Sequence, residues 1–392
     1  MMLADVFYAL FMLAIAGNLA ATAYVLMAIW RVNKFRQQRR ASGTFQPSVT
    51  ILKPVCGLDA GLYENLRSFC IQDYPQYQVI FGVREADDPA VPVVERLKKE
   101  FPSVDISLVI DATVVGPNLK ASNLGNMYRL AAHSYLVIAD SDMRVDEQYV
   151  SCVIAPFEDA QVGVVTCLYS GTSMGGFPSL LASMFINEWF LPSVLVSAGL
   201  SEIRFALGAT MVVRRKLLEK IGGFNKLSYF LADDHMLGKL ISDQGFKVIL
   251  SNYVVENIVH EKSLGALLRH ELRWARTIRA VEPLGHAFSF FMYGVPLAFF
   301  GALMIHLTVD SEILELGIVA LAIFLRCWMH FAINRKLGVA PGYLSILLVP
   351  VRDTLSLLIW SASFFGHKID WKDTTFTVSP SGVINTTERY ET

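Results

Sequence analysis

Two kinds of hydrophobic pattern divide the chain. Four apolar runs, at residues 7–30, 288–307, 313–333 and 344–365, are each near the roughly 20 residues that a bilayer-spanning helix requires. Between the first run and the other three, short apolar runs alternate with segments of helical periodicity. The pattern therefore predicts an anchor helix and linker (1–46), a water-soluble domain (47–284), membrane or re-entrant helices (285–370) and a tail (371–392).

The charges around the first apolar run set its orientation. A basic cluster follows this run, made of Arg31, Lys34, Arg36, Arg39 and Arg40. A cleaved signal peptide would instead carry positive charge before its apolar run, where this chain has Asp5. We therefore predict an uncleaved signal anchor whose basic end, and the domain that follows it, face the cytoplasm.

The three C-terminal runs leave the side of the tail open. Asp310-Ser311-Glu312 has the length and charge of an external turn, and Arg335-Lys336 marks a return to the cytoplasm. A strict count of four spans places the tail outside. The last run, however, contains Pro350 and the pair Arg352-Asp353, and intramembrane charges need a partner or water. A re-entrant or interfacial helix, which would keep the tail inside, is the alternative.

Another apolar stretch, at residues 177–200, lies within the soluble region. It is interrupted by Pro178, Asn187-Glu188 and Pro192. We interpret it as a helix lying on the membrane surface. A helix buried in a protein core fits the same pattern equally well.

The soluble region itself predicts an α/β fold. Strands are expected at 48–52, 78–83, 105–110 and 135–139, with helices at 61–70, 91–99 and 121–132 between them. This alternation is typical of a mostly parallel, doubly wound sheet. Ligands of such sheets bind at the carboxyl ends of the strands.

Composition supports the mixed architecture and excludes some functions. The chain has 392 residues, of which 53% are hydrophobic and 18% are charged, and its mean hydropathy is +0.43. The net charge of −1 gives no sign of a nucleic-acid surface. Five cysteines, an odd number without a C-x-x-C pair, argue against a disulfide framework or a zinc site.

Carboxylates follow two of the predicted strands. Asp87-Asp88 comes shortly after strand 78–83, and Asp140-Ser141-Asp142 comes directly after strand 135–139. Either cluster alone is compatible with a turn or a helix cap. Two clusters at strand ends of one sheet favour a site for Mg²⁺ or Mn²⁺ together with substrate phosphate oxygens.

Two later segments carry further candidates. Asp233-Asp234-His235 precedes an amphipathic helix. Asp233 alone could cap that helix, which would leave Asp234 free to act as a base. His235 is either a further titrating group or a surface histidine. Arg269, Arg273 and Arg276 share one face of a second helix, and Trp274 lies beside them. This basic stripe suits either a diphosphate or anionic lipid headgroups.

Taken in order, these residues resemble the family of ceramide glucosyltransferases, membrane relatives of cellulose and hyaluronan synthases. The resemblance covers nearly the whole chain. It is carried by the segments Val49 to Pro54, Asp73-Tyr74-Pro75, Asp87 to Ala90, Asn118 to Leu124, Asp140-Ser141, Asp234 and Arg273-Trp274. It implies a GT-A fold, a Rossmann-like sheet that binds a UDP-sugar with a divalent metal, Mg²⁺ or Mn²⁺.

The resemblance also implies roles for individual residues. Asp234 would be the catalytic base, and Asp140 with Asp142 would hold the metal. Nucleotide-sugar binding would fall to Asp88, Lys120, Asp140, His270, Arg273 and Trp274. A single base and a single displacement imply inversion at the anomeric carbon.

Two departures bear on the acceptor. His270 stands where the family usually has Gln or Arg, and Asp140-Ser141-Asp142 is a full D-x-D where the animal ceramide enzymes have D-S-G. Both features resemble the bacterial hopanoid-associated branch, with a triterpenoid acceptor and UDP-N-acetylglucosamine as the proposed donor. The expected location is then the bacterial inner membrane, with the catalytic domain facing the cytoplasm.

Three rival functions are compatible with parts of the sequence. A polyprenyl-phosphate sugar transferase differs only in its acceptor, and a processive polysaccharide synthase shares the site chemistry but usually has more spans. A non-enzymatic scaffold or transporter is disfavoured, because the carboxylates are intact and no internal repeat is visible.

Overall fold

The computed structural model describes residues 2–38, 43–339, 342–366, 368–371, 374–379 and 382–389. Arg39 and Arg40 of the predicted basic cluster lie outside these residues.

The chain forms two compact units. The helical unit comprises Met1–Gln37, Gly176–Ser201 and Glu261–Gly366, and the α/β unit comprises Gln38–Gly175, Glu202–His260 and His367–Thr392. These units differ from the predicted boundaries, because residues 176–201 and 261–284 pack with the membrane-type helices and the tail packs with the α/β unit.

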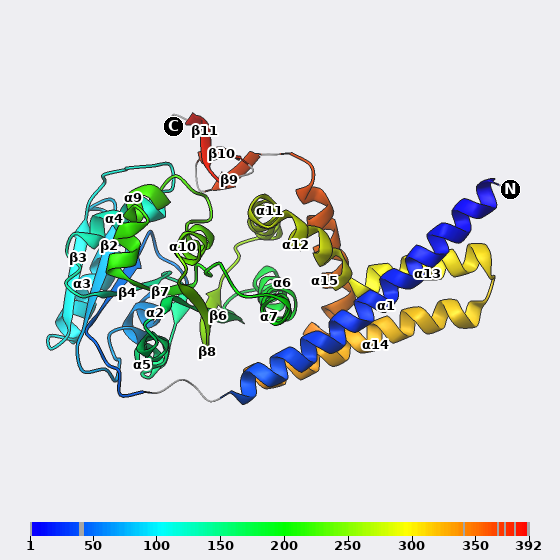
Figure 1. Ribbon diagram of the computed structural model, residues 1–392, viewed down its shortest axis with the longest axis horizontal. Coiled ribbons are helices and arrows are strands. Elements are labelled where there is room, and N and C mark those ends of the chain that lie inside the picture. The colour runs from blue at the N-terminus through cyan, green and yellow to red at the C-terminus, as the bar shows by residue number, and fades with distance from the viewer. Residues whose placement is uncertain are drawn as a thin grey trace. The chain divides into compact units, whose positions relative to one another are not determined.

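The α/β unit is built on an eight-stranded sheet with the order β3-β2-β1-β4-β7-β6-β8-β5 (Figure 1). Its strands are β1 Val49–Pro54, β2 Tyr77–Val83, β3 Asp105–Ile110, β4 Tyr135–Ala139, β5 Met143–Arg144, β6 Val162–Ser173, β7 Thr210–Arg214 and β8 Lys247–Val259. The neighbours β3, β2, β1 and β4 are parallel, as are β6 and β8. Strand β7 runs antiparallel to both β4 and β6. The predicted mostly parallel α/β sheet is confirmed.

Burial on both faces explains why the central strands are apolar without a break. Ile51, Val79 and Val137 point to one buried cluster, and their chain neighbours Leu52, Ile80 and Ile138 point to the other. Successive side chains of a strand alternate between the two faces of a sheet, so a strand covered on both sides must be apolar throughout. The helices of this unit are α2 Leu62–Ser68, α3 Val91–Glu100, α4 Leu119–Tyr128, α5 Tyr149–Ile154, η1 Ala155–Glu158, α8 Arg215–Lys220, α9 Gly223–Leu227 and α10 Asp233–Ser242.

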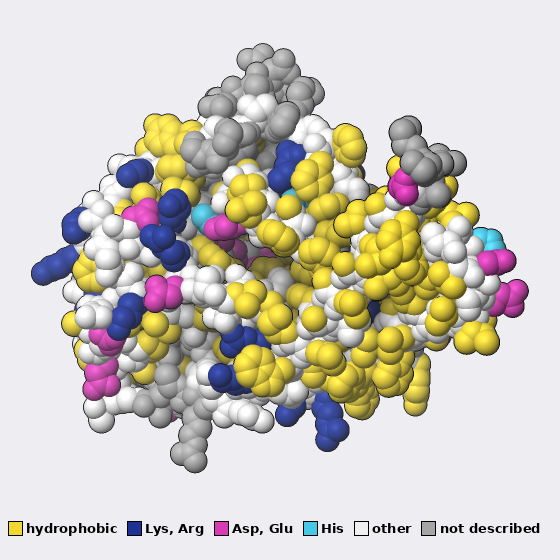
Figure 2. Space-filling view, turned by 45° about the vertical axis from the view of Figure 1, so that its right-hand side comes forward, with side chains coloured by type: hydrophobic (Ala, Val, Ile, Leu, Met, Phe, Trp, Pro, Cys, Tyr) yellow, Lys and Arg dark blue, Asp and Glu magenta, His cyan; other side chains and the backbone are white. Residues whose placement is uncertain are grey.

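The helical unit contains the long apolar helices together with shorter helical segments and the amphipathic α11. Its helices are α1 Met2–Gln37, α6 Phe177–Phe185, η2 Ile186–Phe190, α7 Leu191–Leu200, α11 Leu264–Val281, α12 Pro283–Phe288, η3 Ser289–Met292, α13 Gly294–Thr308, α14 Glu312–Leu337 and α15 Tyr343–Ser363. Among the described residues, four helical stretches are long and apolar enough to cross a membrane, or up to five if the bent pair Pro283–Met292 and Gly294–Thr308 forms one span. Apolar side chains gather over α1, α13 and α14 on the surface (Figure 2).

The basic ends of two membrane-type helices lie together. Arg36, near the end of α1, donates a hydrogen bond to the backbone oxygen of Lys336, near the end of α14, at 3.0 Å. Helix α13 runs the opposite way, from a start beside Ala21 at Gly294. This arrangement agrees with the alternation of directions that the loop charges predict.

The buried acid Asp353, in α15, has partners on three elements. Its carboxylate accepts hydrogen bonds from the Val295 backbone N–H at 2.8 Å and from Trp189 Nε1 at 3.0 Å, and it lies 3.3 Å from Arg326. Val295 is at the start of α13, where helix N–H groups lack partners within the helix. Asp353 therefore supplies a partner to that helix end while its charge is balanced by Arg326.

Helix α15 has both ends near the same end of the other helices. At its start, Ser345 lies 3.1 Å from the ring of His330, in the C-terminal part of α14. At its end, Ser363 lies 2.8 Å from the ring of His286 in α12, just before α13 begins. These contacts favour the re-entrant or interfacial alternative for α15 over a complete crossing.

The stretch Phe177–Leu200 packs inside the helical unit. In its most apolar 18-residue window, 78% of the residues are buried. Glu188 lies in a π-helical turn at the middle of the stretch and contacts His330 of α14 at 2.5 Å. This burial favours the core-helix alternative over a helix that only rests on the membrane surface.

Candidate active site

The sheet order marks one edge position where a ligand is expected to bind. From β1 the chain continues to β2 and β3 on one side, and then returns to β4 on the other. Parallel sheets bind ligands at such a reversal, beyond the carboxyl ends of the two strands. Lys53 lies near the end of β1, and Asp140 follows β4 directly.

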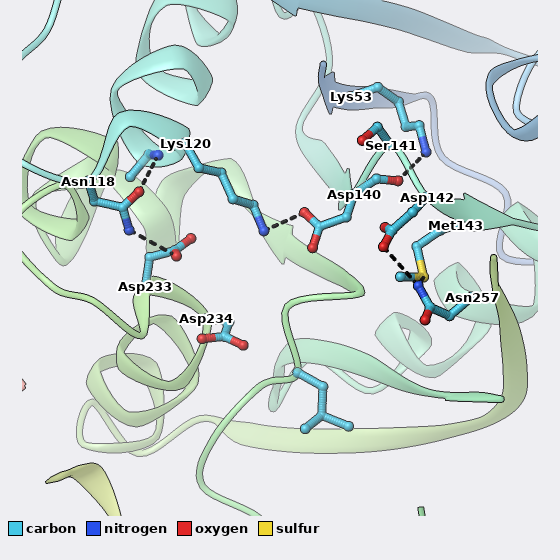
Figure 3. A network of polar contacts seen from close by, with 12 residues as sticks. Lys53, Asn118, Lys120, Asp140, Ser141, Asp142, Met143, Asp233, Asp234 and Asn257 are labelled. Atoms are coloured by element: carbon cyan, nitrogen blue, oxygen red, sulfur yellow. Dashed lines mark hydrogen bonds and ion pairs between the residues drawn. The ribbon is translucent and has the colours of Figure 1, made fainter. Parts of the chain in front are cut away.

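Asp140 is held from three directions (Figure 3). Its carboxylate forms an ion pair with the ammonium group of Lys120. Its backbone N–H donates to the carbonyl of Ala209 at 3.2 Å, and its own carbonyl accepts from Lys53 Nζ at 2.5 Å. The position of this acid is therefore fixed by β1, by α4 and by the segment before β7.

Lys120 lies among three acids. It is in the first turn of α4, which begins where the side chain of Asn118 accepts a hydrogen bond from the N–H of Ala121 at 3.0 Å. Burial alone would lower the pKa of Lys120, but the charges of Asp140, Asp233 and Asp234 outweigh it and raise this pKa. The lysine is therefore a fixed cation that links the acids after β4 to those at the start of α10.

Asp142 is oriented by a strand pairing that the sequence pattern does not reveal. Met143 of β5 pairs with Asn257 of β8, and this register brings Asn257 Nδ2 to 2.9 Å from the Asp142 carboxylate. Burial raises the pKa of Asp142 to about 7, and the charges of Asp140 and Asp59 add to the effect. A half-buried acid among other acids gains stability from any cation bound beside it.

Lys53 is a second buried lysine, near the carboxyl end of β1. Its side chain is 0% exposed, and its Nζ lies 3.7 Å from the centre of the Phe69 ring. Burial lowers the pKa of Lys53 to about 7, although Asp142 and Asp140 oppose the shift. Lys53 is thus able to lose its proton near neutral pH, unlike Lys120.

The two acids at the start of α10 have different surroundings. Asp233 is buried and accepts a hydrogen bond from Asn118 Nδ2 at 3.1 Å; burial raises the pKa of Asp233 to about 6. The expectation that Asp233 caps the helix is wrong, because the capping position is Ala232. Asp234 is half-buried, accepts a hydrogen bond from the His235 N–H at 2.8 Å, and lies apart from the Asn118–Asp233 pair (Figure 3).

Asp88 is placed at another strand end, in the turn before α3. Its carboxylate accepts hydrogen bonds from the backbone N–H of Gly57 at 3.1 Å and from that of Ala90 at 2.8 Å. These contacts connect the turn after β2 to the loop after β1. The structure thus gives Asp88 a definite part in shaping two loops at the carboxyl edge of the sheet.

The remaining predicted site residues belong to the helical unit and share α11. The rings of His270 and Trp274 meet edge to face, with centroids 4.3 Å apart, and His270 Nδ1 contacts Glu261 at 2.7 Å. Arg273 lies on the same helix. His235, the other candidate histidine, belongs to the α/β unit, where it stacks on Phe205 at 5.9 Å.

A buried ion pair fixes α11 within the helical unit. Arg352 of α15 lies 2.6 Å from Glu271, and their side chains are 0% and 4% exposed. Glu271 stands between His270 and Arg273 in the sequence, so this contact sets the rotation of the helix turn that carries both. The predicted need of Arg352 and Asp353 for partners is confirmed.

The acids after β4 have the chemistry of a hard-cation site. Asp140 and Asp142 offer carboxylate oxygens, and Ser141 accompanies them with its hydroxyl bonded to Asp59 at 2.7 Å. Oxygen donors of this kind suit Mg²⁺ or Mn²⁺ when substrate phosphate oxygens complete the coordination. Burial and the neighbouring acids Asp140 and Asp59 raise the pKa of Asp142, so its carboxylate form lacks sufficient positive charge nearby.

Comparison with known proteins decides the family. The chain matches the family described as Glycosyl transferase family 21 over residues 13–384. It belongs to that family. This family 21 glycosyltransferase is similar to two ceramide glucosyltransferases of Caenorhabditis elegans. Ceramide glucosyltransferase 3 is 24% identical and ceramide glucosyltransferase 1 is 23% identical; the matches cover 86% and 87% of this chain and 74% of each relative.

A solved structure supports the fold of the family 21 enzyme. The mannosyltransferase PcManGT from Pyrobaculum calidifontis, in complex with GDP-Man and Mn²⁺, aligns with a TM-score of 0.53 and 19% sequence identity. The alignment covers 91% of this chain and 99% of that chain. The chain therefore has a GT-A fold and is a ceramide glucosyltransferase-like glycosyltransferase, as predicted.

Sequence reasoning missed several residues that shape the site. Asn118 and Asn257 orient acids through contacts 115 positions away in the chain, which no local pattern announces. Asp59 is an isolated exposed acid in a loop. Of these residues, only Lys53 could have been recognised from the sequence, because a lysine inside an otherwise apolar strand requires a specific partner.

Proposed function

We propose that this family 21 glycosyltransferase moves one sugar from a UDP-sugar to the hydroxyl of a membrane lipid, with inversion at the anomeric carbon. The observation that supports this most is the placement of Lys120, which forms an ion pair with Asp140 and whose pKa is also raised by the charges of Asp233 and Asp234 at the start of α10. A site that transfers a sugar from a nucleotide needs acids with two functions. One set holds the metal that binds the diphosphate, and another acid accepts the proton of the attacking hydroxyl.

Asp234 is the residue proposed as the base. It removes the proton of the acceptor hydroxyl as the oxygen attacks the anomeric carbon, which has oxocarbenium character. Its neighbour Asp233 is less suited, because that carboxylate is buried and already accepts from Asn118. Gly208 lies against the half-buried Asp234, and because glycine has no side chain it leaves room for the carboxylate.

The leaving UDP is proposed to lie over Asp140 and Asp142. A divalent cation held by these carboxylates would neutralise charge that builds on the diphosphate as the sugar leaves. Lys120 and Lys53 fix the position of Asp140, and Asn257 fixes that of Asp142. Asp88 is proposed to contact the uridine side, and His270, Arg273 and Trp274 to close on the diphosphate. The GDP-Man and Mn²⁺ bound to the mannosyltransferase PcManGT support a nucleotide-sugar donor and a divalent metal for this fold.

The acceptor is proposed to be a hopanoid or a ceramide-like lipid, and the donor UDP-N-acetylglucosamine or UDP-glucose. The relatives named ceramide glucosyltransferases support a lipid with a free hydroxyl. The complete Asp140-Ser141-Asp142 and the histidine at position 270 favour the hopanoid branch and hence a bacterial inner membrane. The catalytic unit is proposed to face the cytoplasm, where UDP-sugars are made.

A transfer assay with purified protein tests this proposal. Each UDP-sugar, labelled in the sugar, is supplied with Mn²⁺ and with vesicles that contain a hydroxylated hopanoid, ceramide or a polyprenyl phosphate, offered singly and as a mixture. The proposal predicts a single labelled glycolipid that survives mild acid. An acid-labile product would instead indicate a polyprenyl-phosphate acceptor, and a labelled polymer would indicate a processive synthase; either result would contradict the proposal.

A further inference from the structure

The C-terminal tail pairs with the segment that leads into the proposed base. The tail forms a three-stranded antiparallel sheet of β9 Lys368–Trp371, β10 Thr374–Val378 and β11 Ile384–Arg389, in the order β11-β10-β9. Val383 forms an antiparallel bridge with Phe230. The Leu231 N–H donates to the Gly382 carbonyl at 3.2 Å, and the Ile384 N–H donates to the Tyr229 carbonyl at 2.9 Å.

Side chains reinforce this backbone pairing. Leu231, Phe376 and Ile384 form a small apolar cluster in which they are 7%, 2% and 5% exposed. Leu231 is separated from Asp233 by a single residue. The apolar contact of the tail is therefore made almost directly at the start of α10.

The opposite side of the same segment is held by the start of α4. The Asn118 N–H donates to the Ser228 carbonyl at 2.9 Å, and Asn118 Nδ2 donates to the Phe230 carbonyl at 2.9 Å and to Asp233. Gly116 also lies against Ser228, because a Cβ there would come within 2.7 Å of the Ser228 carbonyl oxygen. Phe230 is thus bonded on one side to α4 and paired on the other with the tail.

We propose that the tail is a positioning element of the active site. By pairing with residues 229–231, it holds the start of α10 against α4 and so fixes the direction of the Asp234 carboxylate. This inference rests on the proposed role of Asp234 as the base. The tail touches no reacting atom, and its contribution is to keep the base in a reactive geometry, where displacements of about 1 Å are costly.

The same pairing has a consequence for membrane topology. The tail and the segment before Asp234 belong to one compact unit, so they lie on one side of the membrane. The chain that connects α15 to the tail must then emerge on the side of the catalytic unit. This outcome agrees with the contacts of α15, both of whose ends lie near the same end of the other helices.

The test compares full-length protein with tail variants in detergent. A chain ending after Gly366 lacks the tail, Ile384→Asn disrupts the apolar cluster and Ile384→Val preserves it. A chain ending after Arg389 is the matched truncation control, because it retains all three strands. We expect kcat to fall at least tenfold in the first two variants, UDP affinity to stay within twofold, and both Ile384→Val and the control to match the full-length enzyme.

Two outcomes would overturn the proposal. One is an unchanged kcat in Ile384→Asn and in the chain ending after Gly366. The other is a parallel loss of kcat, UDP affinity and thermal stability, which would mean that the tail only stabilises the fold. Failure of the base assignment is distinguishable, because Asp234→Asn would then remain active whatever the tail variants do.

A cross-link checks the contact itself without removing the tail. Phe230→Cys and Val383→Cys place two thiols at directly opposed positions of an antiparallel bridge, where Cβ atoms are about 4.5–5.5 Å apart and within reach of a disulfide after a small movement. Under mild oxidation we expect a linked peptide by mass spectrometry and retained activity. Absence of the linked peptide in active protein would overturn the proposal.

Discussion

Gly208 lies directly against the carboxylate of Asp234: a Cβ at position 208 would come 2.8 Å from Asp234 Oδ2. Since this oxygen belongs to the proposed base, Gly208→Ala should push the carboxylate aside and lower kcat by about tenfold to 100-fold, as small misplacements of catalytic groups do. Steady-state kinetics at saturating donor measures the effect. Gly125→Ala is the matched control, because its Cβ would meet Phe224 at an ordinary 3.6 Å. Equal activities of the two variants would contradict the close approach.

Removal of the base should separate chemistry from binding. Asp234→Asn keeps the size of the side chain but cannot accept the hydroxyl proton, so turnover should fall by about 10²–10⁴-fold while UDP affinity changes little. Isothermal titration with UDP and Mn²⁺ measures the affinity. Asp243→Asn, at the other end of α10 in contact with Arg204 and Lys239, is a surface control that should retain activity. A nearly normal rate in Asp234→Asn would show that Asp234 is not the catalytic base.

Lys120 should be needed to keep the acids together. Lys120→Met leaves Asp140 and Asp233 without their cation, so we expect a loss of about 1–3 kcal/mol in the free energy of unfolding together with weaker donor binding. Adding Asp233→Asn removes one of the opposing charges and should restore part of the stability. Thermal unfolding of the single and double variants provides the measurement. Strictly additive losses would show that Lys120 and Asp233 act independently.

Metal binding should depend on pH through Asp142. Its pKa is raised to about 7, so the acid gains a proton as pH falls through that value, and a cation must then displace the proton. The Mn²⁺ affinity in the presence of UDP should therefore weaken below about pH 7, approaching tenfold per pH unit. Titration followed by electron paramagnetic resonance measures it. Asp142→Asn should bind Mn²⁺ weakly and lose this dependence; an unchanged pH profile in that variant would place the titrating group elsewhere.

The ion pair between Arg352 and Glu271 offers a test of how α11 is held. Arg352→Met leaves a buried carboxylate without its cation, which costs about 3–5 kcal/mol in comparable pairs. The double variant Arg352→Met and Glu271→Leu removes both charges and should recover most of the thermal stability in detergent. If the double variant is no more stable than Arg352→Met, the pair does not account for the loss.

The fold could be predicted where chain-local patterns decide it. Strands β3 and β4 have the predicted bounds 105–110 and 135–139, because short apolar runs between turn residues permit little else. The antiparallel β7 and the long pair β6 and β8 were not predicted, since their partners are distant in the chain. For the same reason the pairing of the tail with Phe230 left no sequence signal.

In the candidate site too, the residues themselves could be predicted from local sequence patterns, whereas their orientation could not. Asp140, Asp142 and Asp234 could be singled out because acids at a strand end, followed by acids before a later helix, occur in the order that the family resemblance implies. Their orientation depends on Asn257 and Lys120, whose roles arise only when the sheet and α4 are assembled. Asp233 was assigned to a helix cap, and its actual partner is the amide of Asn118.

Transfer of one sugar to a lipid hydroxyl, with Asp234 as the base, should leave a product in the membranes of living cells. Mass spectrometry of total lipids compares cells that produce the full-length chain with cells that produce Asp234→Asn at equal abundance. We expect a lipid that carries a single hexose or N-acetylhexosamine, is stable to mild acid and is absent from the variant. The same glycolipid at equal levels in both cell lines, or a sugar polymer in place of it, would show that the enzyme does not work in this way.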